Sequence, residues 1–380
     1  MTIPVPGATI GVVGGGQLAR MLAEAASPLG VDLVVLDPTP RCPAYPPARD
    51  QIVADFDDEN AISELAERVD ALTLEIELAD PEGLREAVET TGTPVGPDPE
   101  DLRMTRDKLR EKSRLADAGI PVPAYRSVDS PEDLRGAFED LGSPLMLKAR
   151  CGGYDGRGNH VVDGVDAATD YFGTLSGLIA ERLVDFSREV SVMGVNGADE
   201  SATYPTVENV HEEEILRRTF APARTDESVR NRAQSVASDV LEELEGRGVF
   251  GIELFETDDG EVVVNEIAPR PHNSGHYTIE GAVTSQFEQH VRAVLGLPLG
   301  STELRDPTVM ANILGDVDST RPATLLGTGD ALATSGVHLH WYGKRDVRPL
   351  RKMGHVTATG PTLEEANRTV DRALTSLTFE

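Results

Sequence analysis

Apolar and polar positions alternate along the first hundred residues in a way that predicts a βαβ unit. Residues 8–37 read as an apolar strand, a glycine turn, a helix and a second apolar strand that ends at Asp37. The helix is indicated by apolar residues that recur on one face, namely Leu18, Met21, Leu22 and Ala25. Further apolar runs at 51–56 and 71–77 predict more strands, and the proline-rich segment 92–102 indicates a boundary. The pattern predicts a Rossmann-like N-terminal domain.

Helices and paired strands are mixed along the rest of the chain. A helical stretch is expected from Leu102 through Lys108 and Lys112, and another helix at 131–142 begins with proline and ends with glycine. Strands are expected at 143–150, 178–185, 188–195, 248–257 and 261–270, and helices at 227–248 and 284–297. The tail is strand-rich and closes with a helix from Pro361. This pattern predicts an α+β centre followed by a β-rich C-terminal part.

Composition and charge exclude several classes of protein. The chain has 380 residues, 39% hydrophobic content and a formal net charge of -30, so we expect a globular enzyme that binds neither nucleic acid nor anionic membranes. No apolar run approaches the roughly 20 residues of a membrane span, and the start lacks a basic leader, which favours a cytoplasmic location. Two cysteines are too few for a disulfide scaffold.

The basic residues are unevenly divided between the two types. Lysines occupy only positions 108, 112, 148, 344 and 352, while the other basic residues are arginine. We interpret the acidic, lysine-poor surface as a halophilic adaptation, since charges are screened over about 3 Å at 1 M salt. The alternative is an ordinary acidic protein.

Two glycine-rich segments are candidate phosphate-binding loops. Gly11, Gly14 and Gly16 partly match a dinucleotide-binding turn, with Asp37 placed like a ribose-binding acid, but the same turn could bind another phosphate or only pack tightly. The second segment, "LMLKARCGGYDGRGNHVV" at 145–162, is a strand, a glycine loop and a strand, so it is not a Walker A loop. Such a hairpin can close over a nucleotide, with Lys148 facing the phosphates. A glycine hairpin without a ligand is the alternative.

A pair of acidic residues lies on two strands that a tight turn joins. Glu253 belongs to "GIELF", and Asn265 and Glu266 belong to "VVVNEIAPR". Paired strands bring such carboxylates close together, which is costly unless a cation neutralises them. Mg²⁺ binds one or two carboxylates together with phosphate oxygens. The pattern therefore favours a magnesium-phosphate site over a solvated hairpin face.

Four segments together resemble the ATP-grasp superfamily and, within it, the N5-carboxyaminoimidazole ribonucleotide synthase family. They are "GGGQLARM", "KARCGGYDGRGN", "NEIAPRPHNSGHYTIEGAVTSQFEQHVRAVLGLPL" and "HLHWYGKRDVRPLRKMGH", and the resemblance runs from Thr9 to the C-terminus. It implies a Rossmann-like N-terminal domain at 1–104, an ATP-grasp domain at 105–293 with a lid near 145–160, and a small β-rich C-terminal domain at 294–380.

The reaction that the resemblance implies is the carboxylation of 5-aminoimidazole ribonucleotide in purine biosynthesis. ATP and Mg²⁺ convert bicarbonate to carboxyphosphate, whose carbon passes to the exocyclic amine. It also implies a homodimer and a separate mutase that receives the product. A formate-dependent glycinamide ribonucleotide transformylase and an ATP-grasp-derived nucleotide-binding protein without turnover are the alternatives.

The resemblance assigns site residues by position. Those of the ATP site are Lys108, Lys148, Gly153, Tyr154, Asp155, Gly156, Arg157, Gly158, Asn159, Glu181, Arg182, Leu183, Val184, Glu189, His211, Asn265 and Glu266. Glu253 and Glu266 would hold Mg²⁺. The substrate pocket would comprise Glu75, Tyr154, Asp155, Arg157, His272, Lys352 and Arg351, and the catalytic groups would be Asp155, Arg157, Arg270, His272 and Lys352.

The chain departs from the family pattern at two positions. Lys108 stands where the family usually has arginine, which keeps the charge but loses the two-pronged hydrogen bonding of a guanidinium. Leu78 stands where the family usually has asparagine, which weakens the contact assigned to Glu75.

Overall fold

The structure is a computed structural model that describes residues 2–152 and 158–380. Its N-terminal part is a parallel four-stranded sheet in the order β3-β2-β1-β4, formed by β1 (Thr9–Val13), β2 (Asp32–Leu36), β3 (Asp50–Ile52) and β4 (Ala71–Leu74). Helix α1 (Gln17–Ala26) connects β1 to β2, so the predicted βαβ unit and the Rossmann-like fold are confirmed.

The sequence interpretation missed two helices of this domain, α2 (Glu59–Glu67) and α3 (Pro81–Thr91). Both begin at an aspartate, Asp58 or Asp80, whose carboxylate accepts hydrogen bonds from the first turn. Pro81 also occupies the first position of α3. These are ordinary helix-start signals, so the two helices could have been predicted from the sequence.

Two short helices lead from this domain into the centre of the molecule. The helix expected from Leu102 is divided into α4 (Pro99–Thr105) and α5 (Lys108–Asp117). The division occurs because Asp107 caps α5 by accepting hydrogen bonds from Leu109 and Arg110. Lys108 and Lys112 consequently lie on one short helix, one turn apart.

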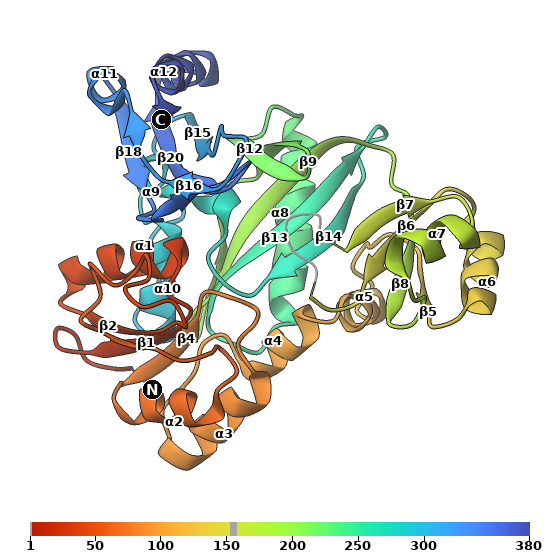
Figure 1. Cartoon of the computed structure of the whole chain (residues 1–380), viewed down its shortest axis with the longest axis horizontal. Helices are drawn as coiled ribbons and strands as arrows, with labels where there is room; N and C mark the ends of the chain where they lie inside the picture. Colours follow the sequence, from red (N-terminus) through yellow and green to blue (C-terminus); the bar gives the residue numbers. More distant parts are fainter. Residues whose placement is uncertain (1, 153–157) are drawn as a thin grey trace.

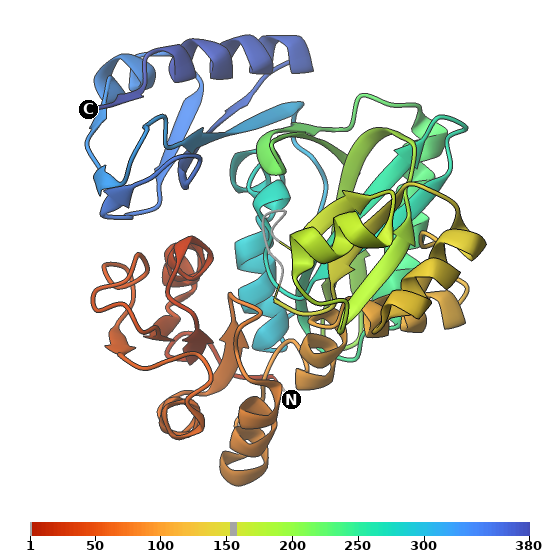
Figure 2. The same cartoon turned by 45° about the vertical axis from the view of Figure 1, so that its right-hand side comes forward.

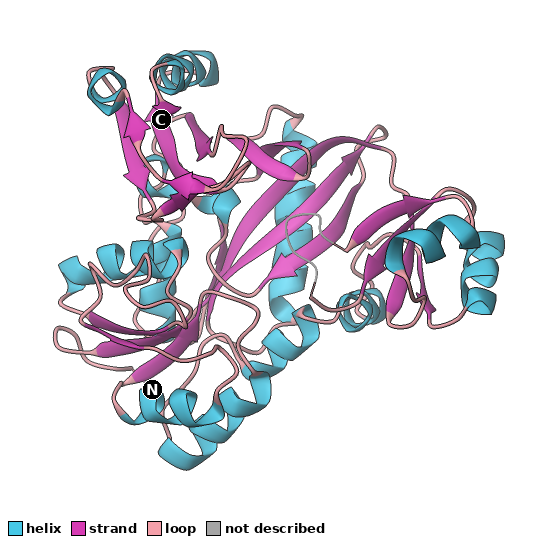
Figure 3. Cartoon of the chain, viewed as in Figure 1, coloured by secondary structure: helices cyan, strands magenta, loops and turns pink. Residues whose placement is uncertain are grey.

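The lid hairpin belongs to a small antiparallel sheet at one side of the molecule (Figures 1 and 3). The strand order is β5-β8-β6-β7, formed by β5 (Tyr125–Val128), β6 (Leu145–Ala149), β7 (Asn159–Val162) and β8 (Leu178–Arg182). Helices α6 (Pro131–Leu141) and α7 (Val165–Phe172) pack against it through a separate apolar core. The expected strand, loop and strand at 145–162 is confirmed for β6 and β7.

A nine-stranded sheet forms the middle of the molecule. Its order is β14-β13-β9-β11-β12-β15-β20-β18, with β10 beside β9. The first part comprises β9 (Phe186–Asn196), β10 (Ser201–Thr203), β11 (Val207–Glu212), β12 (Ile215–Ala221), β13 (Gly248–Thr257) and β14 (Val262–Ala268). Helix α8 (Glu227–Glu242) packs its apolar side against β9 and β13, as its pattern predicts, although it ends earlier than expected.

The C-terminal strands continue this sheet rather than forming a sheet apart. They are β15 (Thr308–Leu314), β18 (Val337–Trp341) and β20 (Lys352–Thr359), and β15 is hydrogen-bonded to β12. Helices α11 (Thr328–Leu332) and α12 (Leu363–Thr375) lie beside them, with two small strand pairs, β16 (Arg321–Pro322) with β19 (Asp346–Val347) and β17 (Leu325–Leu326) with β21 (Thr378–Phe379). The predicted boundaries at 104 and 293 stay predictions.

Short helices connect the N-terminal domain to the large sheet. After a 3-10 turn at Asn273–Gly275 come α9 (Thr278–Gly281) and α10 (Gln286–Val294), and α10 packs against α1 as well as β13. In Figure 2 this helix, in cyan, stands between the N-terminal domain, in red, and the large sheet, in green. No helix in the described part of the chain is both long and apolar enough to cross a bilayer.

Candidate active site

The paired acidic residues lie where the sequence predicted them. Strands β13 and β14 are antiparallel, and Glu253 stands opposite Glu266 in their register. Lys108 on α5 reaches across to Glu266, with 2.8 Å between Nζ and Oε2. Lys108, the nearest cation, holds the pKa of Glu266 well below its usual range. Burial, followed by the negative charge of Glu266, raises the pKa of Glu253 to about 7.

This donor set fits a divalent cation that also binds phosphate oxygens. The carboxylate of Glu253 lies beside that of Glu266. Lys108 lies at hydrogen-bond distance from Glu266 rather than from Glu253. A cation between them would remove the like-charge repulsion that raises the pKa of Glu253. Within residues 2–152 and 158–380, no three His, Cys, Asp or Glu side chains form a complete metal site. Mg²⁺ commonly completes such a site with phosphate oxygens and water.

A second lysine contacts Asn265, the residue directly before Glu266 on β14. Lys148 on β6 lies 2.8 Å from Glu181 Oε2 and donates to Asn265 Oδ1 at 3.2 Å. Burial alone would raise the pKa of Glu181, but Lys112 and Lys148 outweigh burial and lower it. The second oxygen of Glu181 is buried without a hydrogen-bond partner. A buried, unpaired acceptor beside a lysine fits a ligand that carries an amino group and phosphates.

Only part of the predicted lid can be placed. Gly153, Tyr154, Asp155, Gly156 and Arg157 lie outside the described residues. Gly158 directly precedes β7, and its carbonyl accepts from Ala149 N at 2.8 Å. Asn159 begins β7 opposite Lys148 and has a buried, unpaired Oδ1.

Three further predicted residues lie at the end of strand β8 and directly after it. That strand ends at Arg182, which donates to Leu141 O at 3.3 Å, and Leu183 and Val184 lead to β9. Leu183 is 41% exposed. The segment therefore connects the lid sheet to the large sheet.

Glu189 and His211 face each other from neighbouring strands β9 and β11. The distance between Glu189 Oε2 and His211 Nδ1 is 2.7 Å. Burial lowers the pKa of His211, but the Glu189 carboxylate outweighs burial and raises it. The two predicted ATP-site residues thus contact each other, and the raised pKa of His211 favours its charged form.

The loop after β14 carries Arg270 and His272 to the same acidic pair. Arg270 Nη2 lies 2.7 Å from Glu77 Oε1, and His272 Nε2 lies 3.6 Å from Glu253 Oε1. Ser274 contacts His272 Nδ1 through its hydroxyl at 2.9 Å and donates its backbone N–H at 3.5 Å. Nδ1 therefore accepts, and Nε2 carries the proton that faces Glu253.

His272 is held as a neutral imidazole. Burial, followed by the charges of Arg270 and Lys352, lowers its pKa to about 3. Lys352 is the first residue of β20, and its positive charge offsets part of the rise in the pKa of Glu253. Arg351 precedes it and donates to Asp346 O at 2.7 Å. The C-terminal strand thus brings Lys352 to a cluster formed by β13 and the loop after β14.

Glu75 lies at the N-terminus of α1. Its carboxylate accepts hydrogen bonds from the backbone N–H groups of Gly16, Leu18 and Ala19, the latter two at 3.0 Å. Burial raises the pKa of Glu75 to about 7. Its role in orienting a substrate amine stays a prediction, because both oxygens here bind α1. The adjacent Leu78 is 52% exposed.

The first glycine turn is explained by close packing. A side chain at Gly15 would collide with Cys42 Sγ, and one at Gly16 would collide with the Glu75 carboxylate. Asp37 accepts a hydrogen bond from Gly15 N at 2.9 Å. Because the chain's own carboxylates bind the backbone donors of this turn, the tight-packing interpretation fits better than a dinucleotide site.

Sequence reasoning missed two buried residues that hydrogen-bond to the backbone of β14. Lys112 is 1% exposed and donates to the backbone carbonyls of Val264, at 3.0 Å, and Asn265. Its neighbour Glu111 accepts from Ile267 N at 3.0 Å. The available signal was the spacing of Lys108 and Lys112, which places both on one face of a helix.

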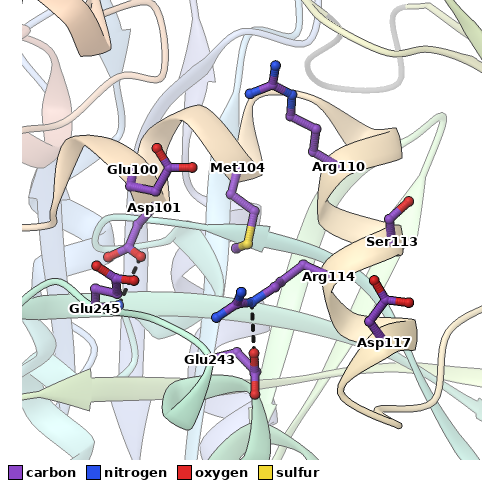
Figure 4. Close-up of a pocket in the computed structure, with 9 residues that line it drawn as sticks. All are labelled: Glu100, Asp101, Met104, Arg110, Ser113, Arg114, Asp117, Glu243 and Glu245. Atoms are coloured by element: carbon purple, nitrogen blue, oxygen red, sulfur yellow. Dashed lines mark hydrogen bonds and ion pairs between the residues drawn. The ribbon is translucent and has the colours of Figure 1, made fainter.

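A pocket of about 350 Å³ lies between α4, α5 and the chain after α8 (Figure 4). Asp101 there accepts hydrogen bonds from Glu245 N at 3.0 Å and Gly246 N at 2.7 Å, and Arg114 lies 2.8 Å from Glu243. None of the residues predicted for the active site lines this pocket.

Three family models match the chain in succession. They are the ribonucleotide synthetase preATP-grasp domain at 7–106, the ATP-grasp domain at 113–287 and the phosphoribosylaminoimidazole carboxylase C-terminal domain at 308–369. The N5-carboxyaminoimidazole ribonucleotide synthase of Bacillus subtilis is 39% identical over 93% of this chain and 91% of that protein. This chain belongs to the N5-carboxyaminoimidazole ribonucleotide synthase family. A phosphoribosylaminoimidazole carboxylase of Ogataea methanolica is 40% identical over 95% of this chain and 68% of its own length.

Solved structures of the N5-carboxyaminoimidazole ribonucleotide synthase family have the same fold. The Thermotoga maritima synthetase is 41% identical, with a TM-score of 0.88 over 98% of this chain and 99% of that one. The Aspergillus clavatus synthase, solved in complex with ADP and 5-aminoimidazole ribonucleotide, is 35% identical, with a TM-score of 0.89 over 98% of both chains. The predicted family and three-part fold are therefore confirmed.

Proposed function

We propose that this protein is an ATP-grasp ligase that carboxylates 5-aminoimidazole ribonucleotide with bicarbonate, yielding N5-carboxyaminoimidazole ribonucleotide for purine biosynthesis. The observation that carries the proposal is the convergence of Glu253, Glu266, Lys108, Lys148 and Asn265 beside the loop that holds Arg270 and His272. That arrangement joins a metal-phosphate site to a cationic pocket for anions. The family membership favours this reaction over the other ATP-grasp activities considered above.

The nucleotide would bind between the lid sheet and β13 and β14. Lys148 and Lys108 would contact its phosphates as point charges, and Glu181, through its unpaired oxygen, would accept from the adenine amino group. Glu189 and His211 would hold the ribose. Glu253 and Glu266 would hold Mg²⁺, which when bound neutralises charge on the transferring phosphoryl group.

Carboxyl transfer would take place on the Arg270 side of the acidic pair. A bicarbonate oxygen attacks the γ-phosphorus and displaces ADP, and the substrate amine then attacks the carboxyphosphate carbon, releasing phosphate and a proton. Arg270, fixed by Glu77, and Lys352 would stabilise the negative charge on these anions. Neutral His272 can donate one hydrogen bond through Nε2 without adding charge. We assign Tyr154, Asp155 and Arg157 of the lid, together with Glu75 and Arg351, to the same pocket.

We further propose a cytoplasmic homodimer adapted to high salt, whose product passes to a separate mutase. The net charge of -30 and the scarcity of lysine support the salt adaptation. Light scattering across salt concentrations measures the oligomeric state, and a monomer under all conditions would contradict the dimer.

The decisive experiment measures ADP release by the purified protein with Mg-ATP and bicarbonate. The rate should rise on addition of 5-aminoimidazole ribonucleotide, and the carbamate product should appear with it. Stimulation by formate and glycinamide ribonucleotide instead would support the transformylase alternative, and nucleotide binding without turnover would support the non-catalytic one.

Lys352→Ala separates the two halves of the reaction. Removing this cation should slow carboxylation by about 2–4 kcal/mol of transition-state stabilisation. The binding of Mg-ATP should change by less than about 1 kcal/mol, because the nucleotide contacts lie elsewhere. Equal losses of carboxylation and ATP affinity would refute this division of roles.

A further inference from the structure

The backbone of His272 is held by the side chain of one buried glutamine. Gln286 is the first residue of α10 and is fully buried. His272 N donates to Gln286 Oε1 at 2.9 Å, and Gln286 Nε2 donates to His272 O at 2.8 Å. One planar amide thus binds both backbone polar groups of the same residue, which fixes the height and direction of the chain at His272.

Two glycines allow close packing around His272 and Gln286. A side chain at Gly251 on β13 would lie 2.5 Å from His272 Cβ. A side chain at Gly275 would collide with Gln286 Oε1. His272 is therefore enclosed between strand β13 on one side and the Gln286 amide on the other.

Helix α10, which carries Gln286, is fixed by packing and by hydrogen bonds. It packs against α1 and β13, and Gln286 N donates to Thr278 Oγ1 at 2.9 Å. The second hydrogen of Gln286 Nε2 faces His276 Nδ1 at 3.2 Å. Burial lowers the pKa of His276 well below its usual range, which keeps that ring neutral and able to accept. The Gln286 amide consequently has partners for both of its protons.

We propose that Gln286 is a positioning residue for carboxyl transfer, which acts by holding His272, and with it the adjoining Arg270, at the acidic pair. Gln286 itself does not touch the acidic residues in any contact described above. The inference rests on the proposed function, since it takes His272 and Arg270 as groups that bind bicarbonate and carboxyphosphate. It predicts a defect in the use of bicarbonate rather than in the binding of ATP.

The same helix provides a matched control. Gln289 is also fully buried, and it binds the backbone of Gly300 in the same two-sided manner. Gly300 N donates to Gln289 Oε1 and Gln289 Nε2 donates to Gly300 O, both at 2.7 Å. Gly300 belongs to a connection that carries no predicted site residue. Gln286 and Gln289 therefore make the same pair of backbone hydrogen bonds, but Gln286 makes them to His272 and Gln289 makes them to Gly300.

The experiment compares Gln286→Met with Gln289→Met in the full-length protein. Methionine keeps the length of the side chain and removes both hydrogen bonds to the backbone, and at position 286 it also removes the contact with His276 Nδ1. We expect Gln286→Met to lower kcat/KM for bicarbonate by about 10- to 100-fold, the size of effect that a misplacement of about 1 Å produces. The KM for ATP should stay within about twofold, and more ADP should form per carboxylated product. Gln289→Met should lose about as much thermal stability as Gln286→Met. Its kinetic constants should all stay within about threefold of those of the unmodified protein.

The outcomes separate this inference from the proposed function. If the unmodified protein does not carboxylate 5-aminoimidazole ribonucleotide, the proposed function is wrong. If it does, and the two methionine variants lose bicarbonate efficiency equally, or Gln286→Met weakens ATP as much as bicarbonate, Gln286 has only a structural role. If Gln286→Met does not fold, Gln286→Glu replaces it in the experiment, because glutamate keeps the acceptor for His272 N. Its kcat/KM for bicarbonate and its KM for ATP are then compared with those of the unmodified protein in the same way. A failure of both Gln286 variants to fold beside a folded Gln289→Met also overturns the proposal.

Discussion

Replacing Lys112 tests whether a buried cation supports the strand of the metal site. Lys112 is 1% exposed, and its ammonium donates to the carbonyls of Val264 and Asn265, directly before Glu266. Lys112→Met keeps most of the side-chain volume but removes the ammonium donor from both carbonyls. The perturbation therefore acts on the backbone that carries Asn265 and Glu266, and it also removes a charge that lowers the pKa of Glu181.

The expected magnitude follows from these two contacts. Each buried carbonyl that loses its partner costs about 1–3 kcal/mol, which gives roughly 2–6 kcal/mol for the pair. Burial lowers the pKa of Lys112, so the ammonium itself is held at some cost, and its removal offsets part of this loss. We expect a net destabilisation of about 3 kcal/mol, within the range for breaking a buried charged contact.

Arg114→Met on the same helix is the control. Arg114 pairs with Glu243 at 2.8 Å, but its side chain is 53% exposed. An exposed pair of this kind contributes less than about 1 kcal/mol. Urea unfolding at constant salt, followed by circular dichroism, compares the two variants, and the KM for Mg-ATP should rise only for Lys112→Met. If both variants lose the same stability, or if Lys112→Met leaves the KM for Mg-ATP unchanged, the supporting role of Lys112 is refuted.

Three further predictions concern the metal ligands, pH and salt. Glu266→Gln should reduce ADP release at least about 100-fold at saturating Mg²⁺, because one carboxylate ligand is lost; near-normal rates in a folded variant would contradict the metal assignment. Burial raises the pKa of Asp101 to about 6, so the folded protein holds this proton more tightly than the unfolded chain, and stability is lost as pH rises from the unfolded value toward 6. Asp101→Asn should remove that loss, gaining about 1 kcal/mol relative to the unmodified protein between about pH 5 and about pH 7, and a difference that does not change with pH in urea titrations would refute it. Raising KCl from about 0.1 M to about 3 M should raise the melting temperature, since screening weakens the repulsion among excess carboxylates, whereas a flat response would argue against salt adaptation.

The sequence pattern of short segments was enough to predict those parts of the site that lie on strands adjacent in the chain. Glu253 and Glu266 face each other because a short turn at Asp258–Gly260 joins their strands, and period-two alternation places both on one face. The lid hairpin and the βαβ unit were predictable for the same reason, since each is specified by residues close together in the chain. Motif resemblance then added the family and the candidate residues at Arg270, His272 and Lys352.

Tertiary packing decided the contacts between distant segments. Periodicity does not encode which helix face meets which strand, so nothing in the sequence showed that Lys108 pairs with Glu266 or that Glu75 caps α1. The joining of β15 to β12 is likewise a long-range pairing, fixed by the burial of both strands in one sheet. Gln286 is the clearest case, because a glutamine in an amphipathic helix has no distinguishing signal. Its two hydrogen bonds to His272 exist only once α10 is buried against β13, where an unpaired amide would be costly.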